Sequence, residues 1–410
     1  MQKSMAGLPP QDQEILTEQA EATVEVVGSM ADICPIQWDE CANPDPATLN
    51  PFISHAFLRA LEDAETVAPR TGWQPQHLII KDNDDIIQGC MPLYAKSHSK
   101  GEYVFDYGWA DAFERAGGNY YPKLVSAVPF TPVPGRRILA RPGESAHTYE
   151  NLLLAGAIEL TSRYDLSSLH INFLPEQQWH DTAATGFLQR TDQQFHWQNQ
   201  GFDTFDDFLA SLASRKRKAV RKERAQAIEG GLTIEHFRGN EITEAHWDAI
   251  YMFYMDTGSR KWGRPYLNRT FFSMLGETMP DQCLLIMVSR DGNYIGGALN
   301  IVGGDCLYGR YWGAIEHHPC LHFEVCYYQA IEFAILNGLD RVEAGAQGEH
   351  KLARGYMPTA TYSSHYIPNP SFQRAIASYL EEERDYVERS REMLAEYAPY
   401  RRDTDDSDQI

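Results

Sequence analysis

The sequence lacks a long apolar run, paired cysteines and an excess of basic residues. No uninterrupted hydrophobic stretch approaches the roughly 18 residues that a membrane-spanning helix needs. Seven cysteines are scattered without a CxxC pair, so neither a disulfide framework nor a zinc ribbon is indicated. No basic stretch followed by an apolar core marks an export signal at the N-terminus. These absences predict a soluble cytoplasmic protein with reduced thiols.

The chain is strongly acidic. It contains 57 Asp and Glu against 36 Lys and Arg in 410 residues, which gives a formal net charge of −21. Such a surface disfavours nonspecific attraction to nucleic acid or anionic lipid, so a polyanionic partner would need a local basic patch. The length allows two domains, each with its own hydrophobic core.

One stretch, residues 305–366, organises the rest of the chain. Hydrophobic periodicity predicts a strand over Leu307–Trp312, a helix over Leu321–Asn337 with a stop at Gly338, and a second strand over Arg341–Gly345. Alternation along the first strand would place three side chains on one face, where we expect them to line a substrate site: Tyr308, Arg310 and Trp312.

The loop after the second strand holds the groups most capable of chemistry. In open α/β sheets, ligands bind outside the carboxyl ends of strands, where such loops emerge. We therefore place the reaction centre there. Substrate-binding side chains are expected from this loop and from the start of the preceding helix, although helix capping explains Glu324 equally well: Gln347, His322, Glu324 and Tyr327.

The two halves of the chain share a succession of predicted elements, which indicates an internal repeat. The first half has, in order, three predicted strands, a helix and a strand: His77–Lys81, Ile86–Tyr94, Glu102–Trp109, His147–Tyr164 and Ser168–Phe173. The second half repeats this order with strands at Cys283–Ser289 and Tyr294–Val302, followed by the strand, helix and strand of residues 305–366. Repeats of this size indicate duplicated domains rather than a solenoid. We expect a mobile extension over 1–30, domains over 31–198 and 199–400, a closing helix near Phe372–Tyr397, and an acidic tail over 401–410.

Two further segments are candidates for binding. An insertion in the first half, Ala110–Gly143, is rich in proline and carries Tyr121 and Lys123, so it is expected either to line a cleft or to be a plain surface excursion. The loop Thr257–Tyr266 is expected to be a substrate lid or a domain contact.

A helix predicted over Phe205–Glu229 contains a dense basic run, SRKRKAVRKER. Repulsion among these cations is tolerated only where solvent or an anion offsets it. A solvated face is one interpretation, and binding of phosphates on RNA or on a nucleotide-linked substrate is the preferred one. The expected phosphate-binding residues are Arg215, Arg217, Lys218, Arg221 and Lys222.

Several long motifs together resemble one family. They are VEAGAQGEHKLARGY (Val342–Tyr356), CLYGRYWG (Cys306–Gly313), LHFEVCYYQAIE (Leu321–Glu332), EYVFDYGWADA (Glu102–Ala112), YYPKL (Tyr120–Leu124) and the basic run. The set closely resembles the bacterial FemAB-like predicted N-acyltransferases of the peptidoglycan biosynthesis or recognition type. The resemblance covers about Ile33–Leu380 and implies an α/β (α+β) fold with two tandem GNAT-type domains around a shared cleft.

The resemblance also implies a reaction. The better-understood Fem ligases pass an amino acid from aminoacyl-tRNA to an amine of a peptidoglycan precursor, so we expect an N-acyltransferase with tRNA as a partner and no cofactor. Alternatives are an acyl-CoA-dependent N-acetyltransferase and a non-catalytic cell-wall or RNA recognition protein. CoA is disfavoured because the nearest match to the pyrophosphate-binding pattern [QR]xxGx[GA], Arg310–Ile315, has the wrong last residue.

Aminoacyl transfer needs an uncharged amine, a path for its proton and a cation near the developing oxyanion. Lys351 or Arg354 is expected to stabilise the oxyanion or a nearby phosphate. By resemblance, Arg354, Gly355 and Tyr356 match the Lys/Gly/aromatic motif of Fem ligases and Lys351 lies just before it, so either residue is a candidate for the key cation. Glu343 or His350 is expected to orient or deprotonate the amine, and Asp106 to help bind it. A buried ion pair with an arginine is the alternative role of Glu343.

A metal site is not expected. The histidines and cysteine between positions 317 and 324 have neither HExxH nor paired CxxC spacing.

Overall fold

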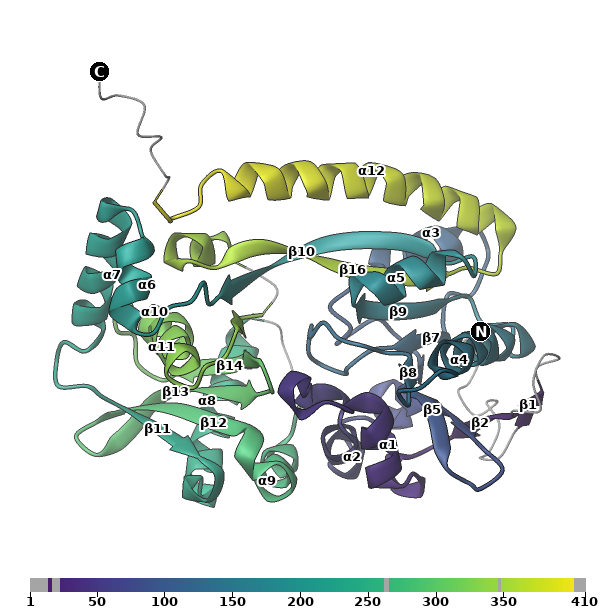
Figure 1. The fold of residues 1–410 in the computed structure, drawn as a ribbon, viewed down its shortest axis with the longest axis horizontal. Coiled ribbons are helices and arrows are strands. Elements are labelled where there is room, and N and C mark those ends of the chain that lie inside the picture. The colour runs from purple at the N-terminus through teal and green to yellow at the C-terminus, as the bar shows by residue number, and fades with distance from the viewer. Residues whose placement is uncertain (1–13, 17–22, 262–264, 346–347, 402–410) are drawn as a thin grey trace. The chain divides into compact units, whose positions relative to one another are not determined.

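The computed structural model describes residues 14–16, 23–261, 265–345 and 348–401, which form two compact units (Figure 1). Unit 1 comprises Met1–Asp192, Tyr266–Met279 and Ala360–Glu388, and unit 2 comprises Gln193–Pro265, Pro280–Thr359 and Arg389–Ile410. The two later segments of unit 1 lie within residues 199–400, the predicted second domain. They pack in unit 1 because Phe271 lies 5.9 Å from Phe57, ring centroid to ring centroid, and residues 362–366 pair with an early strand.

Unit 1 contains two sheets. The first has the order β1-β2-β4-β5-β8, and the second runs β16-β9-β7-β6-β3. Their bounds are β1 Glu14–Leu16, β2 Thr23–Val27, β3 Trp73–Pro75, β4 His77–Lys81, β5 Ile87–Met91, β6 Tyr94–Lys96, β7 Lys123–Ser126, β8 Leu139–Ala140, β9 Leu169–Leu174 and β16 Met357–Tyr366. The helices are α1 Pro35–Ala42, α2 His55–Asp63, α3 Tyr107–Arg115, α4 Ala146–Arg163, α5 Glu176–Ala183, α9 Arg269–Thr278 and α12 Pro370–Ala395, whose last residues belong to unit 2.

Unit 2 is built on the order β11-β12-β13-β14-β15-β10. Its strands are β10 Leu188–Gln198, whose first residues belong to unit 1, β11 Thr233–Arg238, β12 Cys283–Arg290, β13 Asn293–Val302, β14 Cys306–Ala314 and β15 Arg341–Glu343. Its helices are α6 Phe205–Ser211, α7 Ser214–Ala227, α8 Glu244–Lys261, α10 Leu321–Phe323, a π-helix Glu324–Tyr328, α11 Gln329–Leu336 and a 3-10 helix Glu349–Arg354.

Each unit contains a parallel strand–helix–strand motif. In unit 2, β14 pairs in parallel with β15 across the helix of 321–336, as predicted. In unit 1, β7 pairs in parallel with β9 across α4. The expected third strand of the first repeat, Glu102–Trp109, is wrong, because Tyr103 has a positive φ of 60° and α3 begins at Tyr107. The insertion itself supplies the missing strand, β7.

Strands distant in sequence complete both sheets. In unit 1, β16 pairs antiparallel with β9, with His365 opposite His170. In unit 2, β10 pairs antiparallel with β15, with His196 opposite Glu343. The core of unit 2 packs the π-helix and α11 against β12–β14, and Tyr328 and Val325 are fully buried there.

Two predicted segments have different local structure. The basic helix is broken into α6 and α7 because Leu212 bridges to Tyr400 and the amide of Ala213 donates to the carbonyl of Pro399. The first part of the expected loop Thr257–Tyr266 continues α8 as far as Lys261, and residues 262–264 lie outside the described residues.

Candidate functional site

Lys351 is the most unusual cation of the loop that follows β15. Its side chain is buried, with 2% of the residue exposed, and its Nζ donates to the carbonyl of Gly345 at 2.8 Å. No carboxylate of the described residues forms an ion pair with it. The pKa of Lys351 is lowered to about 7, chiefly by burial; Cys326 opposes this shift and Arg310 adds to it. The uncharged amine of Lys351 is therefore accessible at neutral pH.

Glu343 ends β15 and is 3% exposed. Its Oε1 lies 3.4 Å from Nε of Arg341, and its Oε2 lies 3.8 Å from Nη2 of Arg310. Within the described residues, Oε2 accepts no hydrogen bond. His196 lies opposite Glu343 in the sheet. Burial lowers the pKa of His196, and the nearby Glu343 carboxylate only partly offsets this effect. The carboxylate is thus paired with arginines, as the alternative interpretation proposed, and still has an oxygen available for a further donor.

A β-bulge decides which way the side chains of β14 point. Leu299 pairs with Tyr311 and Asn300 pairs with Gly309, so Arg310 is the extra residue. The expectation that Tyr308, Arg310 and Trp312 share a face is therefore wrong, because one inserted residue reverses the alternation. Trp312 packs against the core around α11, while Arg310 is buried with its guanidinium carbon 5.2 Å from the Tyr308 ring. Bulges of this kind re-aim side chains next to active sites.

Arg354 is committed to internal partners. Its Nε and Nη2 donate to the two oxygens of Glu223 at 3.1 and 2.9 Å, and its Nη1 donates to the carbonyl of His350 at 2.7 Å. The guanidinium carbon also lies 3.4 Å from the centroid of the Phe323 ring. Such a bidentate pair fixes the loop against α7. This geometry makes Lys351, rather than Arg354, the better candidate for the reactive side chain of the loop.

Several aromatic side chains gather beside the loop. The hydroxyl of Tyr327, which is carried on the π-helix, lies 2.9 Å from Nε2 of His350. The ring of His322 packs 5.3 Å from Tyr327 and 5.7 Å from Trp312 between centroids. The structure therefore brings these four predicted residues together, and π-helical turns are frequent at functional sites. Gln347 lies outside the described residues.

Glu324 forms a buried ion pair. It is 2% exposed, and Nη2 of Arg224 lies 3.1 Å from its Oε1. Nη2 of Arg224 also lies 2.6 Å from Oε2 of Glu332. Glu324 therefore joins α7 to the π-helix, and this pairing leaves little room for the predicted contact with substrate.

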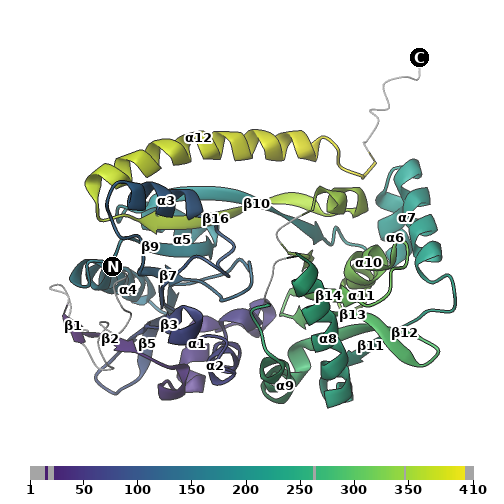
Figure 2. The same cartoon turned by 180° about the vertical axis from the view of Figure 1, so that it is seen from behind.

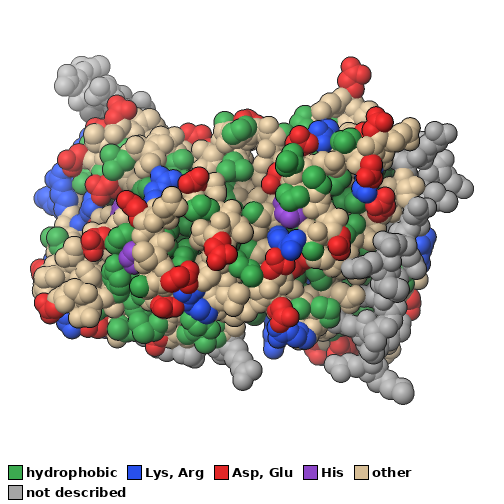
Figure 3. Space-filling view, turned by 90° about the horizontal axis from the view of Figure 1, so that it is seen from below, with side chains coloured by type: hydrophobic (Ala, Val, Ile, Leu, Met, Phe, Trp, Pro, Cys, Tyr) green, Lys and Arg blue, Asp and Glu red, His purple; other side chains and the backbone are tan. Residues whose placement is uncertain are grey.

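The basic face of α7 is open to solvent. Of the five predicted phosphate-binding residues, Arg215, Lys218, Arg221 and Lys222 are exposed and Arg217 is half-buried. Nη2 of Arg221 lies 3.5 Å from Oδ1 of Asp206, and both side chains are more than half exposed. This ion pair therefore contributes little to the stability of the fold. On the face drawn in Figure 3, by contrast, acidic, basic and hydrophobic side chains are interspersed.

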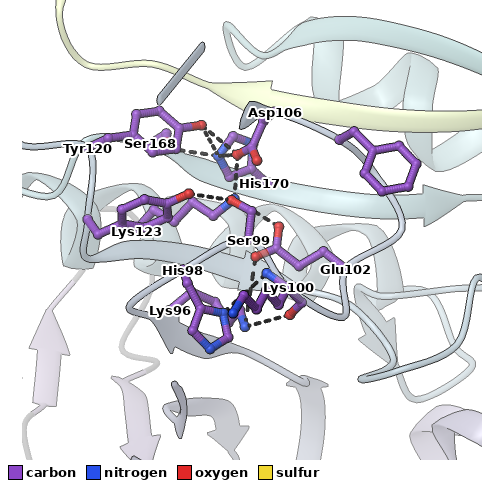
Figure 4. A network of polar contacts seen from close by, with 12 residues as sticks. Lys96, His98, Ser99, Lys100, Glu102, Asp106, Tyr120, Lys123, Ser168 and His170 are labelled. Carbon is purple, nitrogen blue, oxygen red and sulfur yellow. Dashed lines mark hydrogen bonds and ion pairs between the residues drawn. The ribbon is translucent and has the colours of Figure 1, made fainter. Parts of the chain in front are cut away.

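In unit 1, Asp106 and Lys123 belong to one buried network (Figure 4), and the partly buried Tyr121 joins it through Ser99. The Nζ of Lys123 donates to Asp106, to Glu102 at 2.8 Å and to Ser99 at 2.9 Å, and the Ser99 hydroxyl bonds that of Tyr121 at 2.8 Å. The structure thus brings these three predicted residues together. Lys123 and Asp106 are fully or almost fully buried, and each binds the other rather than facing solvent.

The network holds two lysines, Lys96 and Lys123, and two carboxylates, Glu102 and Asp106. Burial holds the pKa of Lys96 well below its usual range. Burial raises the pKa of Glu102 to about 6, although Lys123 opposes the rise. Burial also tends to raise the pKa of Asp106, but the interactions with Lys123 and His170 outweigh burial and hold the pKa of Asp106 well below its usual range. Sequence reasoning missed Lys96, Glu102 and His170, because Glu102 was assigned to a strand and the other two have no distinctive spacing.

Two findings concern metals and membranes. Within the described residues, no group of three or more His, Cys, Asp or Glu side chains could hold a metal ion. None of the helices that the structure describes is long and apolar enough to cross a membrane.

Comparisons with known proteins gave one family match and several structural matches. The profile of the FemAB-like family, described as peptidoglycan biosynthesis/recognition, matches residues 29–402. The crystal structure of FemX superposes with a TM-score of 0.50 and 14% identity, covering 84% of this chain and 98% of its own. A tandem GNAT protein of the clavulanic acid biosynthesis pathway gives a TM-score of 0.46 and 13% identity, over 85% of this chain and 99% of its own. No curated protein matches.

Proposed function

The chain belongs to the FemAB-like family and has two tandem GNAT-type domains, and from this premise we propose that it is an N-acyltransferase. It would transfer an aminoacyl or acyl group from an activated donor to an amine acceptor. The observation that carries the proposal is the buried Lys351, whose pKa of about 7 makes it a proton acceptor suited to neutral pH. The cleft between the domains and their sequence boundaries stay predictions.

The proposed reaction assigns one role to each group. The acceptor nitrogen attacks the acyl carbonyl carbon, and the uncharged amine of Lys351 takes the proton that this nitrogen loses. The bond between the carbonyl carbon and the donor oxygen or sulfur then breaks, and Lys351 returns the proton to the leaving atom. Glu343, with its available Oε2, would orient the attacking amine, and the buried Arg310 would face the oxyanion.

The donor is proposed to carry phosphates that bind α7. The four exposed cations of this helix supply a local positive surface on an acidic chain. An aminoacyl-tRNA fits this surface better than acyl-CoA, because Arg310, the first residue of the nearest pyrophosphate pattern, is buried. A peptidoglycan precursor is the proposed acceptor.

Product formation tests the proposal. Wild-type protein is incubated with aminoacyl-tRNA or acetyl-CoA and a lysine-containing muropeptide, and products are identified by mass spectrometry. We expect product from aminoacyl-tRNA, a loss of at least a hundredfold in Lys351→Ala, and an unchanged rate in the exposed-lysine control Lys100→Ala. Full activity of Lys351→Ala would refute the proposed role of Lys351.

A second candidate is a non-catalytic recognition protein. The observation that favours it is the internal pairing of Arg354 with Glu223 and of Asp106 with Lys123. Tight binding of the muropeptide or tRNA without any chemical change, under all donors tried, would support this candidate over the enzyme.

A further inference from the structure

Glu223 has no role in the proposed reaction, although it lies in the helix that is proposed to bind the donor. It is the only acidic residue of the basic run SRKRKAVRKER, residues 214–224. A carboxylate repels phosphates and therefore opposes donor binding there. Its side chain is 25% exposed, whereas the adjacent Lys222 is open to solvent. These observations point to a role for Glu223 on the inner side of α7.

Glu223 joins three elements of unit 2. Its two oxygens accept hydrogen bonds from Nε and Nη2 of Arg354, at 3.1 and 2.9 Å, in the 3-10 helix that carries Lys351. Its Oε2 also accepts a hydrogen bond from the hydroxyl of Tyr328, a fully buried residue of the π-helix. In both views α7 lies beside α10, which leads into that π-helix (Figures 1 and 2). The carboxylate is therefore the point at which α7, the π-helix and the loop of Lys351 meet.

Further contacts close the same loop. Nη1 of Arg354 donates to the carbonyl of His350 at 2.7 Å, so that the backbone turns around Lys351. The hydroxyl of Tyr400 donates to the carbonyl of Gly355 at 2.8 Å. Lys351 lies between these contacts, with 2% of the residue exposed. Its burial therefore depends on the position of the loop, which the bidentate ion pair described above fixes against α7.

We propose that Glu223 is a positioning residue for the proposed acyl transfer: it holds the loop closed, so that Lys351 stays buried and ready to accept a proton. The inference rests on the proposed function, because it identifies what keeps the reactive lysine of that site in its state. Glu223 touches no reacting atom and acts through Arg354. The same helix would then hold the donor with its outer cations and the reactive loop with its inner carboxylate.

The sign of the effect separates position from charge. Across the described part of unit 2, the titratable groups that act on Lys351 are Arg310 on β14 and Cys326 on the π-helix, and Lys351 in turn lowers the pKa of His196 on β10. If Glu223 acted through its negative charge, its removal would lower the pKa of Lys351. If it acts by holding the loop, its removal admits water to Lys351, and the pKa rises towards its ordinary value of 10.5.

Carbon-13 NMR of protein labelled at the lysine Cε measures this pKa without any substrate, and Lys351→Met identifies the signal. We expect Glu223→Ala to raise the pKa of Lys351 by at least about one unit, and Glu223→Gln, which can still accept from Arg354, to raise it less. Glu332→Ala is the matched control, because Glu332 pairs with Arg224 of the same helix from α11, and it should leave the pKa unchanged. Glu223→Gln decides alone if Glu223→Ala does not fold. An unchanged or lowered pKa in the Glu223 variants, or an equal rise in Glu332→Ala, would overturn the proposal.

The pH dependence of acyl transfer provides the second readout. The rate rises with pH as Lys351 loses its proton, so an upward shift of about one unit lowers kcat at pH 6.5 by up to about tenfold and leaves kcat at pH 9.5 close to that of the wild type. The KM for aminoacyl-tRNA should not rise in Glu223→Ala, because α7 loses a negative charge. A loss of kcat that is equal at both pH values would overturn the positioning role. Absence of product from the wild type with every donor would refute the proposed function instead, and the NMR titration would still decide the role of Glu223.

Discussion

Replacing Lys351 by methionine tests the physical basis of the proposed site. The change removes the only titrating group of this side chain and keeps most of its volume. In the folded protein the pKa of Lys351 falls from its ordinary value of 10.5 to about 7. The folded state therefore holds the charged form about 5 kcal/mol less favourably than the unfolded chain does, as an order of magnitude.

The sign of the pH dependence follows from proton binding. Between pH 7 and 10.5 the unfolded chain keeps the Lys351 proton and the folded protein has lost it. The free energy of unfolding of the wild type should therefore rise with pH in this window, by about 1.4 kcal/mol per pH unit from this group. Lys351→Met lacks this contribution. It should be the more stable protein at pH 6.5, by about 3 to 4 kcal/mol once a lost hydrogen bond of about 1 kcal/mol to Gly345 is deducted.

Urea unfolding followed by tryptophan fluorescence, at pH 6.5 and pH 9.5, measures this difference. The advantage of Lys351→Met should shrink by about 3 kcal/mol at the higher pH. Lys222→Met, at an exposed lysine of α7, is the matched control and should differ from the wild type equally at both pH values. An advantage of Lys351→Met that does not change with pH would refute the claim that Lys351 is held partly uncharged at neutral pH.

Three further predictions concern stability. The double-mutant cycle of Glu223→Ala and Arg354→Ala should give a coupling of about 2 kcal/mol in urea unfolding, because the pair is bidentate and mostly buried; additive effects would contradict this. Lys123→Met should destabilise the protein by about 3 to 5 kcal/mol in thermal unfolding, since two buried carboxylates lose their partner, while Lys100→Met should have little effect. Gly313→Ala should cost about 1 to 3 kcal/mol by the same assay, because its Cβ would lie 2.2 Å from the carbonyl oxygen of Phe253; wild-type stability would show that the backbone yields freely.

Local pattern was enough to predict much of the fold. The strand, helix and strand of residues 306–343 follow from periodicity, and Gly338, with a φ of 65°, ends the helix as expected. The third strand of the first repeat could not be found in this way. The segment 102–109 has strand-like composition, yet a single positive φ at Tyr103 and the start of α3 exclude a strand there. The conformation of this segment is set by its contacts in the folded protein and not by its strand-like composition.

The candidate site was predictable in location but not in detail. The loop carrying His350, Lys351 and Arg354 could be found because reactive side chains are dense there, and Glu343 precedes it. What could not be predicted is that Arg354 pairs with Glu223, 131 residues away in sequence, because no spacing rule identifies such a partner. Because the sequence does not reveal this pairing, it predicts Lys351 and Arg354 equally as the reactive side chain of the loop.

The sequence by itself determined the duplicated elements, the basic run of α7 and the dense polar loop, because all three depend on residues close together in the chain. Only the tertiary structure decided that β10 and β16 complete sheets far from their neighbours in sequence, and that a bulge turns Arg310 from its expected face. It also decided that Lys351 is buried and that no carboxylate among the described residues forms an ion pair with it. The physical reason is that burial, and with it the pKa of a lysine, is set by whatever the fold packs around a side chain, and local sequence does not specify those neighbours.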